Sequence, residues 1–239
     1  MLSNLLNNPF FSRSVEADQA VAPTDARYGL FFVYVVLSLS INDVLVLFAK
    51  FFGVDVQAAP FNWFSSILYF VVTFVFMMRL GLHYRDFGFT FKNSKQSIKE
   101  GSSLALVSVT LFGVVCAMGH YFLGWPLKFV SQGFKGLFSV SSLAYFAHVV
   151  LQEVGFRGLY MGSLYKFMNK MHPFLVIVLS SLVFAVLHAH LGLFGFLAAF
   201  FSSLLFGYLY LRHQNLMGVI ILHFVLGLIL FNFILMPVH

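Results

Sequence analysis

Residues 60–80 read PFNWFSSILYFVVTFVFMMRL, an apolar run with no charged residue before Arg79. A helix needs about 20 such residues to cross a hydrocarbon core about 30 Å thick. Further apolar runs occupy residues 28–52, 102–123, 139–165, 173–189, 193–211 and 216–237. None shows the ten-residue alternating segments of a transmembrane β-barrel. The sequence therefore predicts an all-α polytopic membrane protein with about seven to eight transmembrane helices.

The composition supports this class and excludes several others. Of 239 residues, 60% are hydrophobic and 9% are charged, whereas a soluble domain carries about 25% charged residues. An aromatic content of 19% excludes a disordered chain. The net charge of +6 comes without a basic cluster interleaved with aromatics, so we expect no nucleic-acid partner. The single Cys116 excludes an intramolecular disulfide.

The basic residues are distributed unevenly between the predicted loops. With a cytoplasmic N-terminus, most of the 14 Lys and Arg residues fall on the cytoplasmic face. The opposite face holds Lys50, Lys128 and Lys135. The positive-inside rule then predicts that the N-terminus is inside and the C-terminus outside. We expect a multi-pass protein of a bacterial inner membrane, with the endoplasmic reticulum as the alternative; its oligomeric state is left open.

Two charges lie within the fourth apolar run, where each is energetically costly. Glu153 and Arg157 are four residues apart, so on a helix they share a face and can form an ion pair. His188 closes the fifth run, and His223 lies inside the last one. Taken singly, these side chains also fit a structural ion pair and hydrogen-bonded core histidines.

Together, a carboxylate and two histidines on three helices favour hydrolysis. They can activate and orient a water and donate hydrogen bonds to an oxyanion. The same set, Glu153, His188 and His223, could instead ligate a metal ion, although no His-Glu-x-x-His motif is present. His148 lies one turn before Gln152 on the same helix face and is a candidate supporting residue.

Three short motifs resemble those of the CAAX protease and bacteriocin-processing family, which includes the Rce1-type prenyl-protein endopeptidases. The family pattern is Glu-Glu-x-x-x-Arg, then Phe-x-x-x-His, then His-x-x-x-Asn. This chain has QEVGFR at 152–157, FAVLH at 184–188 and HFVLG at 223–227. The resemblance covers residues 139–235. It implies that this segment is a four-helix catalytic core. From the residues themselves, we expect the preceding chain to comprise an interfacial or linker segment (1–27) and N-terminal transmembrane helices (28–138).

The resemblance also implies a mechanism and a site. A glutamate helped by a histidine activates water, and the last motif forms the oxyanion hole. Carried onto this chain, the catalytic residues are Glu153, His188, His223 and Gln152, with Arg157 in support. No metal or other cofactor is expected. The substrates would be membrane-anchored peptides or protein termini such as prenylated tails, bacteriocin precursors or sorting segments. Because His188 falls near the far end of its run, we expect the cavity to open away from the cytoplasm.

The chain departs from the family pattern at two positions. Gln152 stands where the first glutamate is expected, and Gly227 stands where the asparagine is expected. A glutamine cannot act as a general base, so three interpretations stay open. Glu153 takes over as base, the chain binds peptides without cutting them, or the glutamine is an introduced inactivating change. A backbone N–H, Gln152 or Asn232 could supply the missing oxyanion donor.

The leading hypothesis is therefore a glutamate-dependent intramembrane endopeptidase. The alternatives are a catalytically impaired relative, such as a pseudoprotease or an immunity or regulatory binding protein, and a metal-dependent protease using the same three residues. A transporter with a proton-relay carboxylate is a further alternative.

Overall fold

The computed structural model describes residues 25–52, 59–124, 140–168 and 171–230, and these residues form seven helices. The fourth is composite: α7 runs into a π-helical segment, η2, and then into α8. Their bounds are α3 Ala26–Phe51, α4 Ala59–Arg79, α5 Ser94–Leu123, α7 Val140–Glu153, η2 Val154–Met161, α8 Gly162–Phe167, α9 Pro173–Leu187, α10 Gly192–His213 and α11 Met217–Ile229. Two short 3₁₀ turns, η1 (Tyr84–Phe87) and η3 (Ala189–Leu191), lie between helices.

Each apolar run of the sequence contains a helix, and the described residues form no strand, so the all-α prediction is confirmed for this part of the chain. The third helix begins at Ser94 rather than near residue 102, because it extends through a polar turn that hydropathy alone does not mark. Within the residues that the structure describes, two segments are long and apolar enough to cross a membrane, Ser94–Leu123 and Ala189–His213. The seven-to-eight span count and the three-part division of the chain stay predictions. The predicted segment 1–27 lies almost wholly outside the described residues, as do residues 231–235 of the predicted core.

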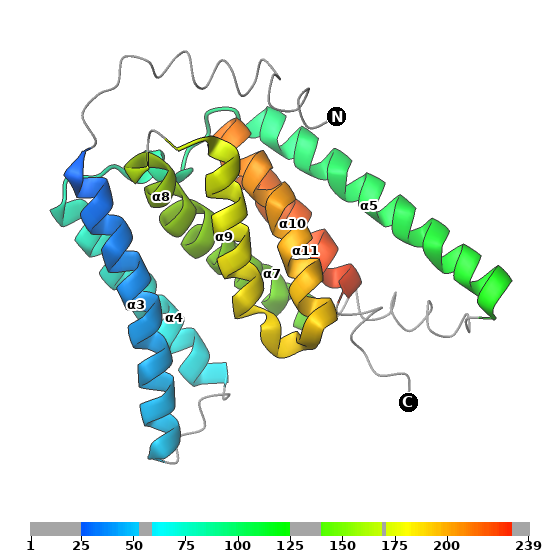
Figure 1. Cartoon of the computed structure of the whole chain (residues 1–239), viewed down its shortest axis with the longest axis horizontal. Helices are drawn as coiled ribbons and strands as arrows, with labels where there is room; N and C mark the ends of the chain where they lie inside the picture. Colours follow the sequence, from blue (N-terminus) through cyan, green and yellow to red (C-terminus); the bar gives the residue numbers. More distant parts are fainter. Residues whose placement is uncertain (1–24, 53–58, 125–139, 169–170, 231–239) are drawn as a thin grey trace.

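The helices alternate in direction, and the central group is formed by the composite helix with α9, α10 and α11 (Figure 1). Helix α9 packs along α10, α11 along α5, and α3 against α8. The α3–α4 pair stands on one side of the group, while the far half of α5 projects from the other side (Figure 1). Phe32 joins α3 to the composite helix, since its ring lies 5.5 Å from the Tyr160 ring.

Helices α5 and α11 cross at a glycine of each helix, Gly101 and Gly218. A Cβ on Gly101 would overlap with the backbone of Gly218, and a Cβ on Gly218 would overlap with the backbone of Ser97. The Gly218 N–H donates to Oγ of Ser97 at 3.1 Å. Small residues permit this kind of close helix contact in membrane proteins. The crossing fixes the start of α11, which carries His223.

A buried asparagine ties the turn between α10 and α11 to the segment before α5. Asn215 is fully buried, and its side-chain amide donates to the carbonyls of Thr90 and Lys92 at 2.5 and 3.2 Å. Its Oδ1 accepts from the N–H of Met217 at 2.9 Å, which caps α11. Nearby, Glu100 accepts from Nε2 of His213 at 2.9 Å. We call this set of contacts the turn clamp.

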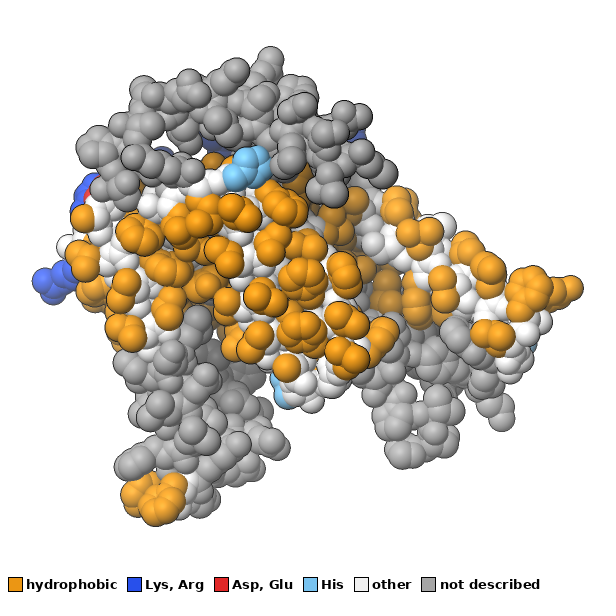
Figure 2. All heavy atoms as spheres, in the orientation of Figure 1, with side chains coloured by type: hydrophobic (Ala, Val, Ile, Leu, Met, Phe, Trp, Pro, Cys, Tyr) orange, Lys and Arg blue, Asp and Glu red, His pale blue; other side chains and the backbone are white. Residues whose placement is uncertain are grey.

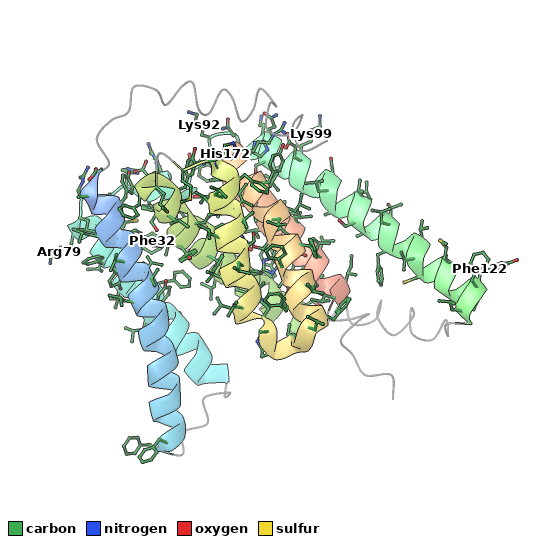
Figure 3. The ribbon with its side chains drawn as sticks, viewed as in Figure 1. Phe32, Arg79, Lys92, Lys99, Phe122 and His172 are labelled. Carbon is green, nitrogen blue, oxygen red and sulfur yellow. The ribbon has the colours of Figure 1, made fainter. Side chains whose placement is uncertain are left out.

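The outer surface is apolar along much of the length of the helices. Large hydrophobic side chains are exposed along α5, α9 and α10, and they dominate the face seen in Figure 2. Lys92, Lys99 and His172 lie together at one end of the helices, whereas Phe122 lies at the far end of α5 (Figure 3). An apolar flank with basic residues gathered at one end is the pattern expected of helices in a bilayer.

Candidate active site

The π-helical segment begins directly after two adjacent residues with different surroundings. Gln152 is half-buried and lines a cavity, whereas Glu153 is completely buried. π-helical turns are rare and occur often at functional sites. Gly158 and Gly162 allow close packing here, since a Cβ on each would lie 3.0 Å from the Phe87 carbonyl and 2.8 Å from the Tyr210 hydroxyl.

The carboxylate of Glu153 lies between a histidine and an arginine. Its Oε1 is 2.5 Å from Nδ1 of His223, and because a carboxylate only accepts, Nδ1–H is the donor. Its Oε2 is 3.6 Å from Nε of Arg157, so the ion pair predicted from their spacing is present. The side chains of Glu153 and Arg157 are both 0% exposed. Such a pair holds the carboxylate in place, because a buried charge without a partner is strongly unfavourable.

Arg157 is enclosed by aromatic rings. The carbon of its guanidinium lies 5.1, 4.4 and 5.3 Å from the ring centres of Phe156, Phe184 and Phe206. Its Nη2 donates to Oγ of Ser203 on α10 at 2.9 Å. Cation–π contacts of this kind are stronger when the cation is desolvated. The rings and the serine therefore fix the arginine, which in turn fixes one side of Glu153.

His188 occupies the C-terminal cap of α9. Its Nδ1 is 2.8 Å from the carbonyl oxygen of Phe184, and since a carbonyl only accepts, Nδ1–H donates. This tautomer leaves Nε2 as an acceptor. The Phe184 ring is 4.4 Å from the His188 ring and 5.9 Å from the His223 ring. The phenylalanine of the second motif thus contacts both histidines and the arginine.

A cavity of about 340 Å³ lies beside these groups. Its wall is mostly apolar and aromatic, with polar side chains converging on it from α7, the end of α9, η3, α10 and α11. The polar lining residues are Tyr145, His148, Gln152, His188, His190, Ser202 and His223. The cavity reaches η3 and the last described turn of α11, the end of the helices opposite Lys99 and His172 (Figure 3).

A second cavity, of about 250 Å³, lies between α4, the composite helix and α9. Tyr69 and Phe70 form its α4 side. It shares five lining residues with the first cavity: His148, Gln152, Phe184, His188 and His190. The two cavities therefore flank one wall, which carries both Gln152 and His188.

The predicted metal-ligand set is not assembled in the described residues. There, no three His, Cys, Asp or Glu side chains are grouped so that they could hold a metal ion. Each oxygen of Glu153 faces a cation or donor of the protein itself. Glu153 is completely buried and lines neither cavity, whereas its partner His223 lines the first.

The structure brings together most of the residues that the sequence singled out. Glu153 contacts both Arg157 and His223, while His188, His148 and Gln152 line the cavity beside His223. Asn232, considered as an oxyanion donor, lies outside the described residues.

Sequence reasoning missed several polar side chains of the site, among them Ser203 and Tyr145. Ser203 bonds to Arg157, and nothing distinguishes it in the sequence from other small helix-packing serines. Tyr145 lines the cavity with His148 and Gln152. Tyr145 lies three residues before His148 and seven before Gln152. This spacing places all three on one helix face and was the signal available in the sequence.

Comparison with known proteins gives one match. A family model described as type II CAAX prenyl endopeptidase Rce1-like matches residues 134–229. No curated protein and no solved structure matches the chain. The matched segment includes all three motifs and every residue that lines the two cavities except Tyr69 and Phe70 on α4 and Leu230, which directly follows α11.

Proposed function

Because residues 134–229 form an Rce1-like type II CAAX prenyl endopeptidase domain, we propose that this protein is an intramembrane endopeptidase that uses a Glu153–His223 pair to activate water. The family domain and the exposed apolar helices support an integral membrane location. The observation that carries the mechanism is the 2.5 Å contact between Glu153 and His223 in the wall of the 340 Å³ cavity.

The base in this mechanism is His223, oriented by Glu153. The carboxylate accepts from Nδ1–H, so the imidazole keeps Nε2 unprotonated for a group in the cavity. The negative charge of Glu153 also stabilises the imidazolium that forms when Nε2 takes a proton. A carboxylate that orients a histidine and supports its charge is a recurrent catalytic arrangement. Glu153 thus acts through His223 rather than by touching the water, because its own oxygens are buried.

The reaction then proceeds without a covalent enzyme intermediate. His223 Nε2 removes a proton from water, and the resulting hydroxide attacks the scissile carbonyl carbon. The oxyanion that forms accepts a hydrogen bond from the side-chain amide of Gln152, and His188 Nε2 helps to hold the attacking water. His223 next returns its proton to the leaving nitrogen, and the C–N bond breaks. Water is consumed, and a carboxylic acid and an amine are released, after which the acid loses its proton to the amine or to solvent.

The substrates are membrane-anchored peptides or protein termini. The cavities are apolar and flank one wall, which suits an extended chain with hydrophobic side chains. The main cavity lies at the end opposite the basic residues. With the N-terminus inside, this is the non-cytoplasmic end, and exported peptides are then favoured over cytosolic tails. A bacterial inner membrane fits this arrangement, with the endoplasmic reticulum as the alternative.

Peptide cleavage by purified protein tests the proposal. The probe is a library of internally quenched lipidated peptides, including farnesylated peptides, presented in detergent micelles. Glu153→Gln and His223→Gln should each lower cleavage by about 10²–10⁴-fold, which is the usual contribution of a general base. His223→Gln is informative because an amide can still donate to Glu153 but cannot take a proton.

The matched control is His120→Gln, near the end of α5 remote from the cavity, which should cleave at the wild-type rate. The thermal unfolding temperature of every variant is measured, so that loss of the catalytic base can be distinguished from loss of folded protein. Unchanged cleavage by His223→Gln would refute the mechanism. Loss of activity with a chelator, and its recovery with zinc, would favour the metal-dependent alternative instead.

One observation favours a second candidate function, a peptide-binding protein that does not hydrolyse. Gln152 lines both cavities at a position where a carboxylate would face a bound chain. The side-chain amide of Gln152 can still form hydrogen bonds with the backbone of a bound peptide. In that case a lipidated probe peptide is retained by the purified protein and recovered intact, and wild-type protein shows no turnover.

A further inference from the structure

A tyrosine hydroxyl occupies the space above the glycine of the last motif. A Cβ built on Gly227 would overlap with the hydroxyl oxygen of Tyr145, so any side chain at 227 would displace that hydroxyl. The hydroxyl therefore lies where the side chain of residue 227 would start. The glycine and the tyrosine depend on each other sterically.

This location brings the hydroxyl close to His223. Residues 223 and 227 are one helical turn apart on the same face of α11, where Cβ positions are about 5–6 Å apart. A group standing at the Cβ position of 227 is therefore a neighbour of the His223 side chain. Both side chains line the same cavity, and neither is separated from it by another residue. A carbonyl group held in front of His223 lies within reach of a phenolic hydroxyl at this place.

The tyrosine is held firmly enough to act as a fixed donor. Its ring stacks on Phe224 of α11, with ring centres 6.0 Å apart and an interplanar angle of 26°. On its own helix it shares a face with His148 and Gln152, so the backbone of α7 sets its distance from them. Preorganised donors are effective because they need no reorientation as charge develops.

We propose that Tyr145 is a catalytic residue that donates a hydrogen bond from its hydroxyl to the oxyanion of the tetrahedral intermediate, in the space left by Gly227. Gln152 and Tyr145, about two turns apart on α7, then both donate to the intermediate, while His223 acts on it from α11. The hydroxyl keeps its proton throughout, so the proton balance of the reaction is unchanged. This inference rests on the proposed peptidase function.

Tyr145→Phe is the primary test, because it removes the hydroxyl and keeps the ring that stacks on Phe224. With the fastest-cleaved peptide of the library, kcat should fall by about 10²-fold, the lower end of the loss for one oxyanion donor, while KM changes little. A difluoromethyl ketone analogue of a farnesylated probe peptide, which hydrates to a tetrahedral form, should lose affinity in parallel. The unmodified peptide should bind equally well to both proteins.

Tyr121→Phe is the matched control, because this tyrosine is exposed at the end of α5 remote from the cavity. It should show wild-type kcat and wild-type affinity for the ketone. A Tyr145→Phe protein with wild-type kcat and undiminished preference for the ketone would overturn the inference while leaving the peptidase proposal intact. A wild-type protein that neither cleaves the library nor prefers the ketone would overturn both.

A paired substitution tests the steric dependence. Gly227→Asn alone should reduce activity, because the new side chain collides with the Tyr145 hydroxyl. Tyr145→Ala combined with Gly227→Asn removes the collision and places an amide donor in the vacated space. The double variant should cleave at least about tenfold faster than Tyr145→Ala, as one donor restores part of the lost stabilisation. A double variant slower than both single variants would contradict the shared space.

Discussion

At the scale of single residues, neighbours in the sequence have separate tasks. Gln152 faces the cavities, whereas Glu153 is buried against His223 and Arg157. In the sequence, Gln152 followed by Glu153 looks like a pair of adjacent glutamates from which one carboxylate is missing. In three dimensions the glutamate supports a histidine, and the glutamine presents an amide to the cavity. The missing charge at 152 therefore does not remove the charge that orients His223.

Changing Gln152 to glutamate distinguishes the two candidate functions. If His223 is the base and the Gln152 amide donates to the oxyanion, Gln152→Glu replaces a donor by a negative charge. Cleavage should then fall by at least about tenfold, since the charge opposes the oxyanion and one donor is lost. The measurement is the initial rate of peptide cleavage against pH.

Ser102→Glu is the control, because it adds the same charge at an exposed position in the first half of α5. Its cleavage rate should match that of the wild type. If wild-type protein is inert and Gln152→Glu gains turnover, the chain is an impaired peptidase and the second candidate function is the right one.

At the scale of elements, the position of His223 depends on contacts at the start of its helix. The Gly101–Gly218 crossing and the turn clamp hold α11 against α5 and against the segment before α5. The helices themselves were predictable, because long apolar runs specify them locally. The π-helical segment and the clamp were not, since each depends on groups more than a hundred residues away or on backbone register that hydropathy does not encode.

Asn215→Ala tests the clamp. The change leaves the carbonyls of Thr90 and Lys92 without this donor and uncaps Met217. Leaving buried polar groups unsatisfied costs about 1–3 kcal/mol each, so the protein should unfold at a lower temperature in detergent. Cleavage should fall as well, because α11 carries the base.

The comparison variant is Lys95→Ala, an exposed side chain near the start of α5, which should leave the unfolding temperature unchanged. An Asn215→Ala protein as stable as wild type would mean that the Gly101–Gly218 crossing alone fixes α11.

At the scale of the whole molecule, charge and cavity lie at opposite ends. Basic residues gather around the start of α5 and α9, while the main cavity lies near η3 and the end of α11. The sequence predicts a cytoplasmic N-terminus from the distribution of Lys and Arg. Combined with the position of the cavity, that orientation directs the site away from the cytoplasm.

Cysteine accessibility tests the orientation. In a Cys116→Ala background, Lys99→Cys and Phe122→Cys place single thiols at the two ends of α5. A membrane-impermeant maleimide added to intact cells or spheroplasts should label Phe122→Cys, and it should label Lys99→Cys only after the membrane is opened. The Cys116→Ala parent, which has no thiol, sets the background. The reverse labelling pattern would contradict the orientation and direct the cavity toward the cytoplasm.

The sequence by itself determined the all-α class, the helix positions and the residues that form the buried ion pair. The length of the apolar runs and the four-residue spacing of Glu153 and Arg157 are local properties, so they can be recognised in the sequence alone. Only the tertiary structure decided that Glu153 bonds to His223, that Gln152 faces the cavities and that Tyr145 stands over Gly227. These relations depend on how four helices rotate and cross, and helix packing is set by side chains far apart in the sequence.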